Sequence, residues 1–178
     1  MKLIIINGPT GAGKSTLAKK LKDEYPMSFF IHFDGLRRMI GNYHDHREES
    51  RVFTFEITFS IMHTAFKQGR DVIIDKIMYD RIESAFKKRT IDMLYDLAKE
   101  YDAEVHELIL WADKETIMKR LDERGHIQGG FLTKEKAEEF WGEMNKYKDI
   151  QSTAKVVDTT DLDAEKVFKK ACQLIEIV

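Results

Sequence analysis

The chain has 178 residues, of which 43% are hydrophobic and 34% are charged, and its formal net charge is −2. This length favours one domain over residues 1–178, and the composition is typical of an α/β domain with enough apolar residues for a core. The net charge disfavours nucleic acid as a general partner, although a local basic groove would still fit it.

Two sequence features bear on location. No apolar run approaches the roughly 18 residues that a membrane span needs, so we expect no membrane partner. The chain has one cysteine, Cys172, which cannot form an internal disulfide and is expected to be a buried thiol. Because the first expected strand begins at Lys2, leaving no room for a signal peptide, we expect a cytoplasmic protein.

The N-terminal stretch joins an apolar run to a helical pattern through a glycine-rich loop. The loop, Gly8-Pro9-Thr10-Gly11-Ala12-Gly13-Lys14-Ser15-Thr16, fits the P-loop pattern G-x-x-x-x-G-K-[ST]. Glycines let successive backbone N–H groups surround an anion, and the start of the helix adds its positive dipole. We therefore expect Lys14 to contact the β- and γ-phosphates and Ser15 to ligate magnesium. The expected nucleotide-binding residues are Gly8, Thr10, Gly11, Ala12, Gly13, Lys14, Ser15 and Thr16.

The rest of the chain alternates between strands and helices. The expected strands span residues 2–7, 29–33, 71–75, 105–111 and 154–157. The expected helices span residues 14–24, 34–38, 48–67, 80–101, 113–124, 133–148 and 163–178, with N-caps at Asp80, Asp113 and Thr133. In the third helix, Phe55, Phe59, Met62 and Phe66 recur every three or four residues, which favours core over a substrate pocket. This alternation predicts a parallel sheet covered by helices on both faces.

Two acidic residues fall where ligands of such a sheet gather, at the carboxyl ends of the strands. Asp34 follows the second strand and is a candidate catalytic base, with a helix N-cap as the alternative. Arg37 lies on the same helical face and would contact an anionic substrate group, unless it is an ordinary surface arginine. Asp75 ends the third strand as a short Walker-B-like pattern, which fits either a magnesium ligand or a strand-end cap.

Arg120 and Arg124 lie four residues apart and so face one side of their helix. A glycine-containing loop, residues 126–132, follows them. We expect these features to form a small lid over residues of about 120–135. In that lid one guanidinium would stack on adenine and the other would neutralise the transferred phosphoryl group. The alternative is a solvated helix face paired with Asp122 and Glu123.

These motifs resemble the P-loop kinases of the nucleoside-monophosphate-kinase superfamily, closest to polynucleotide kinases, zeta toxins and chloramphenicol-phosphotransferase-like proteins. The resemblance covers nearly the whole chain, and it implies a three-layer α/β P-loop NTPase fold with sheet order 2-3-1-4-5. It implies ATP and Mg²⁺ as cofactors, with Asp34 as the general base and Arg37 as an acceptor contact. It also implies that Arg124 lies near the transferred phosphoryl group and that Arg120 stacks on adenine.

The resulting hypothesis is an ATP-dependent phosphotransferase that phosphorylates a hydroxyl of a small molecule or a nucleotide. A 5′-hydroxyl polynucleotide kinase is an alternative, supported by local basic residues: Arg37, Arg38, Arg47, Arg51, Lys87, Lys88 and Arg89. A GTPase switch fits poorly, because the D-x-x-G motif at 122–125 lies at a helix end. A non-catalytic nucleotide-binding regulator is the remaining alternative.

Overall fold

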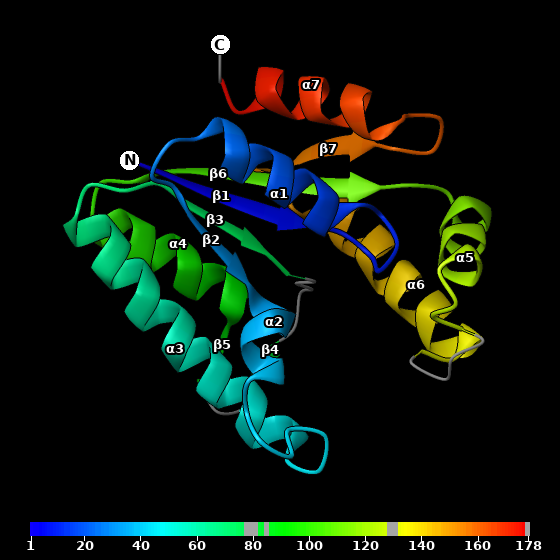
Figure 1. The fold of residues 1–178 in the computed structure, drawn as a ribbon, viewed down its shortest axis with the longest axis horizontal. Helices are drawn as coiled ribbons and strands as arrows, with labels where there is room; N and C mark the ends of the chain where they lie inside the picture. The colour runs from blue at the N-terminus through cyan, green and yellow to red at the C-terminus, as the bar shows by residue number, and fades with distance from the viewer. Residues whose placement is uncertain (77–81, 84–85, 128–131, 177–178) are drawn as a thin grey trace.

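The computed structural model describes residues 1–76, 82–83, 86–127 and 132–176. Five parallel strands form its central sheet in the order β2-β3-β1-β6-β7 (Figure 1). The strands are β1 (Lys2–Asn7), β2 (Phe29–His32), β3 (Val72–Asp75), β6 (Glu104–Trp111) and β7 (Lys155–Asp158). A separate two-stranded sheet holds β4 and β5. The five large strands therefore follow the predicted order 2-3-1-4-5.

Helices cover both faces of this sheet, which confirms the three-layer prediction (Figure 1). One face carries α1 (Lys14–Glu24) and α7 (Ala164–Leu174), and the other carries α3 (Arg47–Lys67) and α4 (Thr90–Glu100). The short α2 (Phe33–Arg38) follows β2 directly. After β6 come α5 (Lys114–Glu123) and α6 (Lys134–Ile150). Along the described ranges, none of these helices is both long enough and apolar enough to cross a bilayer.

The central strand β1 is buried on both sides, as its continuous apolar run predicts. Ile4 and Ile6 pack into the core under α1 and α7, whereas Leu3 and Ile5 pack into the core under α3 and α4. Successive side chains of a strand point to opposite faces, so both faces need apolar cover. On α3, Met62 and Phe66 belong to the core under α3 and α4 and Phe59 packs against it, whereas Phe55 packs on the ring of Phe33. Cys172 is half-buried against the core under α1 and α7.

Two predicted helix caps are confirmed. The backbone N–H of Thr116 donates to Asp113 Oδ1 (2.7 Å) at the start of α5. The backbone N–H of Lys136 donates to Thr133 Oγ1 (3.2 Å) at the start of α6. Each cap satisfies one of the backbone donors that a helix leaves unpaired in its first turn.

The prediction of one helix over 80–101 is wrong in its first half. Strands β4 (Ile82–Glu83) and β5 (Lys88–Arg89) pair antiparallel, and α4 begins only at Thr90. Lys87 takes a left-handed conformation (φ 52°), which interrupts a helix. The Phe86 ring packs edge-on to the ring of Phe55, with centroids 6.0 Å apart, so tertiary packing overrides local helix propensity. Asp80, the predicted cap, lies outside the described residues.

Candidate active site

The P-loop connects the end of β1 to α1 at the carboxyl edge of the sheet. Gly13 is the N-cap of α1 and has a positive φ of 99°, which favours glycine. Ser15 and Thr16 lie in the first turn of α1. The Lys14 ammonium folds back over the loop and donates to the Pro9 carbonyl oxygen (2.9 Å). The loop thus ends at the start of α1, with Lys14 and Ser15 in the first helical turn as the sequence predicts.

Gly8 has no room for a side chain. Its φ is +137°, and a Cβ placed on it would lie 2.2 Å from the Leu110 carbonyl oxygen. We expect Gly8→Ala to lower the free energy of unfolding by about 3 kcal/mol, because strain and a backbone clash act together. Urea unfolding followed by circular dichroism measures this. Gly142→Ala, in α6, is the matched control: no described atom lies within 4 Å of its Cβ position, so stability should rise by about 0.5–1 kcal/mol. Equal stability of Gly8→Ala and the wild type would contradict the steric argument.

Three charged residues act electrostatically on Lys14. Burial lowers the pKa of Lys14 to about 8, while the negative charges of Asp75 and Asp34 oppose that shift. The positive charge of Arg124 lowers the pKa of Lys14 further. The charges of three residues that the sequence analysis assigned to the site, Asp34, Asp75 and Arg124, therefore all act on Lys14.

Asp34 lies in the first turn of α2, and its side chain is exposed. The N-cap of α2 is His32, and among the described residues no side chain caps this helix by a hydrogen bond. The alternative interpretation of Asp34 as a helix cap is therefore wrong, because the helix starts two residues earlier than that interpretation needs. The negative charge of Asp34 instead acts to raise the pKa of both Lys14 and Arg37.

Arg37 is held by the first turn of α3. Its Nε donates to Ser50 Oγ (3.1 Å), and its Nη2 donates to the Arg47 carbonyl oxygen (2.7 Å). Its guanidinium also lies 5.5 Å from the centre of the Tyr43 ring. Arg37 is thus not a freely solvated surface arginine, because its guanidinium is bound within the 43–50 segment. Burial lowers the pKa of Arg37 while the charge of Asp34 opposes this, and the side chain stays cationic.

Asp75 is almost completely buried and forms a pair that the sequence analysis missed. The Nδ1 of His32 donates to Asp75 Oδ1 at 2.7 Å, and the two residues are register partners on the adjacent strands β2 and β3. The predicted sheet order was the signal that would have found this pair, because it puts both strand ends side by side. The Asp75 carboxylate and the Ser15 hydroxyl provide oxygen donors beside the P-loop, and this donor set fits a magnesium ion.

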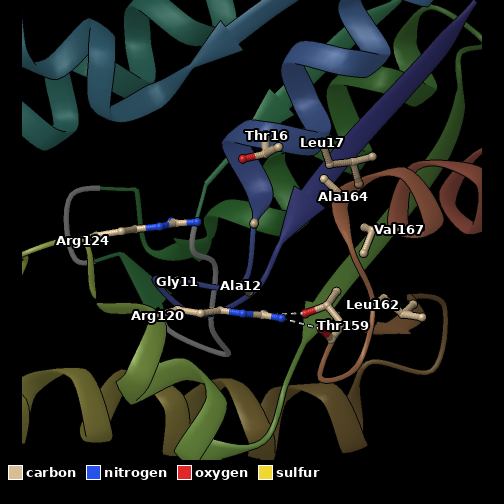
Figure 2. A pocket seen from close by; sticks show the side chains of 11 residues that line it. Gly11, Ala12, Thr16, Leu17, Arg120, Arg124, Thr159, Leu162, Ala164 and Val167 are labelled. Carbon is tan, nitrogen blue, oxygen red and sulfur yellow. Dashed lines mark hydrogen bonds between the residues drawn. The ribbon is translucent and has the colours of Figure 1, made fainter. Parts of the chain in front are cut away.

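Arg120 and Arg124 extend from α5 toward the P-loop (Figure 2). They help to line a cavity of about 200 Å³ between the P-loop, α5 and the chain after β7. Arg120 donates from Nη1 to Thr159 Oγ1 (3.1 Å) and from Nη2 to the Thr159 carbonyl oxygen (2.6 Å). These bonds lie in the plane of the guanidinium, so they are compatible with a base stacking on its face.

The segment after β7 contributes a wall of this cavity that the sequence analysis did not assign. Thr159, Leu162 and Val167 line it opposite the P-loop (Figure 2). Their position after the fifth strand of the sheet was the available signal, since that edge collects ligands in parallel sheets. Of the predicted lid, residues 128–131 lie outside the described part of the chain.

Comparisons with known proteins agree with this fold. A sugar kinase from Janibacter sp. HTCC2649 is 19% identical, with a TM-score of 0.67, and the match covers 100% of this chain and 96% of that one. The tunicamycin resistance protein of Deinococcus radiodurans is 16% identical, with a TM-score of 0.64, and coverage is 100% and 98%. The YorR protein of Bacillus subtilis, solved with phosphorylated GDP, is 24% identical, with a TM-score of 0.61 and coverage of 99% and 96%.

At the level of sequence, no curated protein matches the chain. A family model described as "AAA domain" matches residues 3–146, which include the P-loop, Asp34, Asp75 and both lid arginines. The chain therefore belongs to this AAA domain family of P-loop proteins, and its fold is that of the P-loop kinases.

Proposed function

We propose that the protein is an ATP-dependent phosphotransferase that moves the γ-phosphate of ATP to a hydroxyl of a small molecule or a nucleotide. The observation that carries the proposal is the cavity that Arg124 lines together with Gly13 and Thr16 of the P-loop. The charges of Asp34 and Arg124 both act on Lys14 of the same loop. A nucleotide-binding regulator would need the loop and its lysine, but neither a carboxylate nor a second cation beside them. The sugar kinase and the YorR complex with phosphorylated GDP support the same class of reaction.

The proposed mechanism assigns one role to each charged side chain. The P-loop N–H groups and Lys14 hold the phosphates of ATP, and Arg124 offsets negative charge on the transferred group. Asp34 accepts the proton of the acceptor hydroxyl while the hydroxyl oxygen forms a bond to the γ-phosphorus. The bond from the γ-phosphorus to the bridging oxygen breaks, and ADP leaves. Magnesium, held by Ser15 and Asp75, would supply charge neutralisation between the β- and γ-phosphates.

We favour a small acceptor over an oligonucleotide because several of the basic residues already have ion-pair or hydrogen-bond partners within the protein. Arg89 forms a two-bond ion pair with Asp92 (2.8 and 2.7 Å), and Lys88 pairs with Asp96. Arg37 donates hydrogen bonds to Ser50 and to the Arg47 carbonyl oxygen in the first turn of α3. Positive charges that are already paired contribute less to binding a phosphate backbone. The polynucleotide kinase is therefore our second candidate.

A transfer screen tests the proposed function. The protein is incubated with ATP labelled at the γ-phosphate and with nucleosides, oligonucleotides bearing a 5′-hydroxyl, sugars, shikimate-like acids or aminoglycosides. We expect one class of small acceptor to become labelled, and we expect its labelling to need the P-loop lysine. Labelling of oligonucleotides alone would support the second candidate instead. Nucleotide binding without transfer to any acceptor would support the regulator.

The affinity for nucleotide should decrease as the pH rises above about 8. In the free protein the pKa of Lys14 is lowered to about 8 by burial. Bound phosphates stabilise the ammonium, so its pKa is higher in the complex than in the free protein. Affinity is then constant below the free-state pKa and falls by up to about tenfold per pH unit above it. Fluorescence titration with ADP between about pH 7.5 and 9.5, where the phosphates are fully ionised, measures this. An identical decrease in Lys14→Ala would assign it to another group.

A further inference from the structure

A buried carboxylate lies in the sheet behind the P-loop. Glu107, in β6, is 1% exposed, and it accepts hydrogen bonds from four side chains. Asn7 Nδ2 and the Tyr147 hydroxyl donate to Oε1, each at 3.0 Å. Gln151 Nε2 (3.1 Å) and the Tyr95 hydroxyl (3.3 Å) donate to Oε2. The donors come from the end of β1, from α6 and its C-cap, and from α4. One side chain therefore joins three elements of the fold to β6.

This arrangement stabilises a charge at a costly position. Burial raises the pKa of Glu107, and the four hydrogen bonds oppose that shift. Its register partner on β1, Ile5, is a fully buried core residue, and an apolar side chain at position 107 would avoid the desolvation cost. A carboxylate differs from an apolar side chain in that it accepts several hydrogen bonds at once. What Glu107 provides is therefore a fixed acceptor for its four partners.

Asn7 carries the effect of this acceptor to the P-loop. Its Nδ2 donates to Glu107, while its Oδ1 accepts from the backbone N–H of Gly8 (2.8 Å). The two bonds require opposite ends of one amide, so together they fix how the amide is oriented. Gly8 is the first residue of the P-loop, and glycine samples many backbone conformations, so its φ of 137° must be fixed by its surroundings. Loss of Glu107 removes one of the hydrogen bonds that orient the Asn7 amide, and the acceptor of the Gly8 N–H is then held less firmly.

The other donor to Oε1 belongs to the helix that follows the lid arginines. Tyr147 lies near the C-terminal end of α6, and Gln151 is the C-cap of that helix. We propose that Glu107 is a positioning residue, which fixes the first peptide of the P-loop through Asn7 and ties it to α6. The expected effect on nucleotide binding rests on the proposed function. The structural consequence, a fixed Gly8 amide, does not depend on that function.

The test compares Glu107→Ala, Glu107→Gln and Asn7→Ala with the wild type. Glu107→Gln keeps one oxygen for Asn7 and Tyr147, while its amide nitrogen can face the Tyr95 hydroxyl and a turned Gln151. Thr58→Val is the stability control, because it removes a buried hydrogen bond (2.8 Å, to the Thr54 carbonyl oxygen) inside α3. For each variant we would measure the melting temperature, the hydrogen exchange of the Gly8 amide by NMR, and the dissociation constant for ATP.

We expect Glu107→Ala and Asn7→Ala each to speed Gly8 amide exchange and to weaken ATP binding by about tenfold or more. The double variant should change Gly8 exchange and ATP affinity no more than the more strongly affected single variant does, because both residues act through one hydrogen-bonded path. Glu107→Gln should restore both properties to within about threefold of the wild type. Thr58→Val should lower the melting temperature without changing either property.

Some results would overturn the inference. One is wild-type Gly8 exchange in Asn7→Ala, and another is a change in Thr58→Val as large as that in Glu107→Ala. Should Glu107→Ala not fold, Asn7→Ala and Glu107→Gln still decide the question. If the wild type itself binds no nucleotide, the proposed function fails, while the exchange of the Gly8 amide continues to test the positioning role.

Discussion

Replacement of Lys14 by alanine is expected to abolish phosphoryl transfer, lowering the turnover rate by about 10³-fold or more. The Lys14 ammonium lies over the P-loop, where it donates to the Pro9 carbonyl oxygen. In the complex it would neutralise charge on the β- and γ-phosphates. This stabilisation of the transition state is strongest in a site that excludes water, because charges interact more strongly there. Transfer of labelled phosphate to the acceptor found in the screen, at saturating acceptor, measures the loss.

Lys19→Ala is the matched control for this experiment. Lys19 belongs to the same helix, α1, but its side chain is exposed. Both variants lose one positive charge from one helix, so a general effect of net charge would appear in both. Retention of near-normal turnover in Lys14→Ala would refute the role of the P-loop in transfer, provided that its melting curve matches that of the wild type.

The substitution Asp34→Asn should reduce transfer by about 10²–10⁴-fold, which is the usual contribution of general acid–base catalysis. An amide retains the size of the carboxyl group but does not accept the acceptor's proton at neutral pH. ATP affinity should change by less than about threefold, because Asp34 supplies no positive charge to the phosphate site and only helps to keep Lys14 protonated. Single-turnover transfer and an equilibrium ATP titration measure the two quantities separately.

The comparison between these two measurements decides the role of Asp34. A loss of ATP binding in Asp34→Asn would make Asp34 a metal ligand or a structural support, and the base would have to be sought elsewhere. Asp23→Asn, an exposed acid in α1, is the control for the loss of one negative charge. It should leave both transfer and ATP affinity unchanged.

The sequence predicts those parts of the fold that depend on neighbouring residues. The P-loop follows from nine consecutive residues, and the cap of α5 from Asp113 and the turn that follows it. The five large strands follow from apolar runs, since a strand buried on both faces needs no alternation. The same reasoning fails at Phe86, where the local pattern is helical and contacts with α3 stabilise a hairpin instead.

Contacts between distant residues account for the rest of what the sequence did not predict. The sequence gives no sign that Glu107 accepts from Asn7, because the two residues are 100 positions apart. The same holds for Arg120, whose hydrogen bonds to Thr159 span 39 positions. The hydrogen bond from Arg37 to Ser50 likewise depends on how the 43–50 segment folds back. Each case needs the register of the sheet or the path of a loop before the partner can be named.

The central position of β1 also has a consequence for synthesis of the chain. This strand precedes the other strands of its sheet in the chain, yet it pairs on one side with β3 and on the other with β6. During synthesis the edge of β1 that pairs with β6 therefore stays unpaired until Glu104–Trp111 has emerged from the ribosome. Since pairing across long separations is slow, the P-loop at the end of β1 can take its final position only after that pairing has formed.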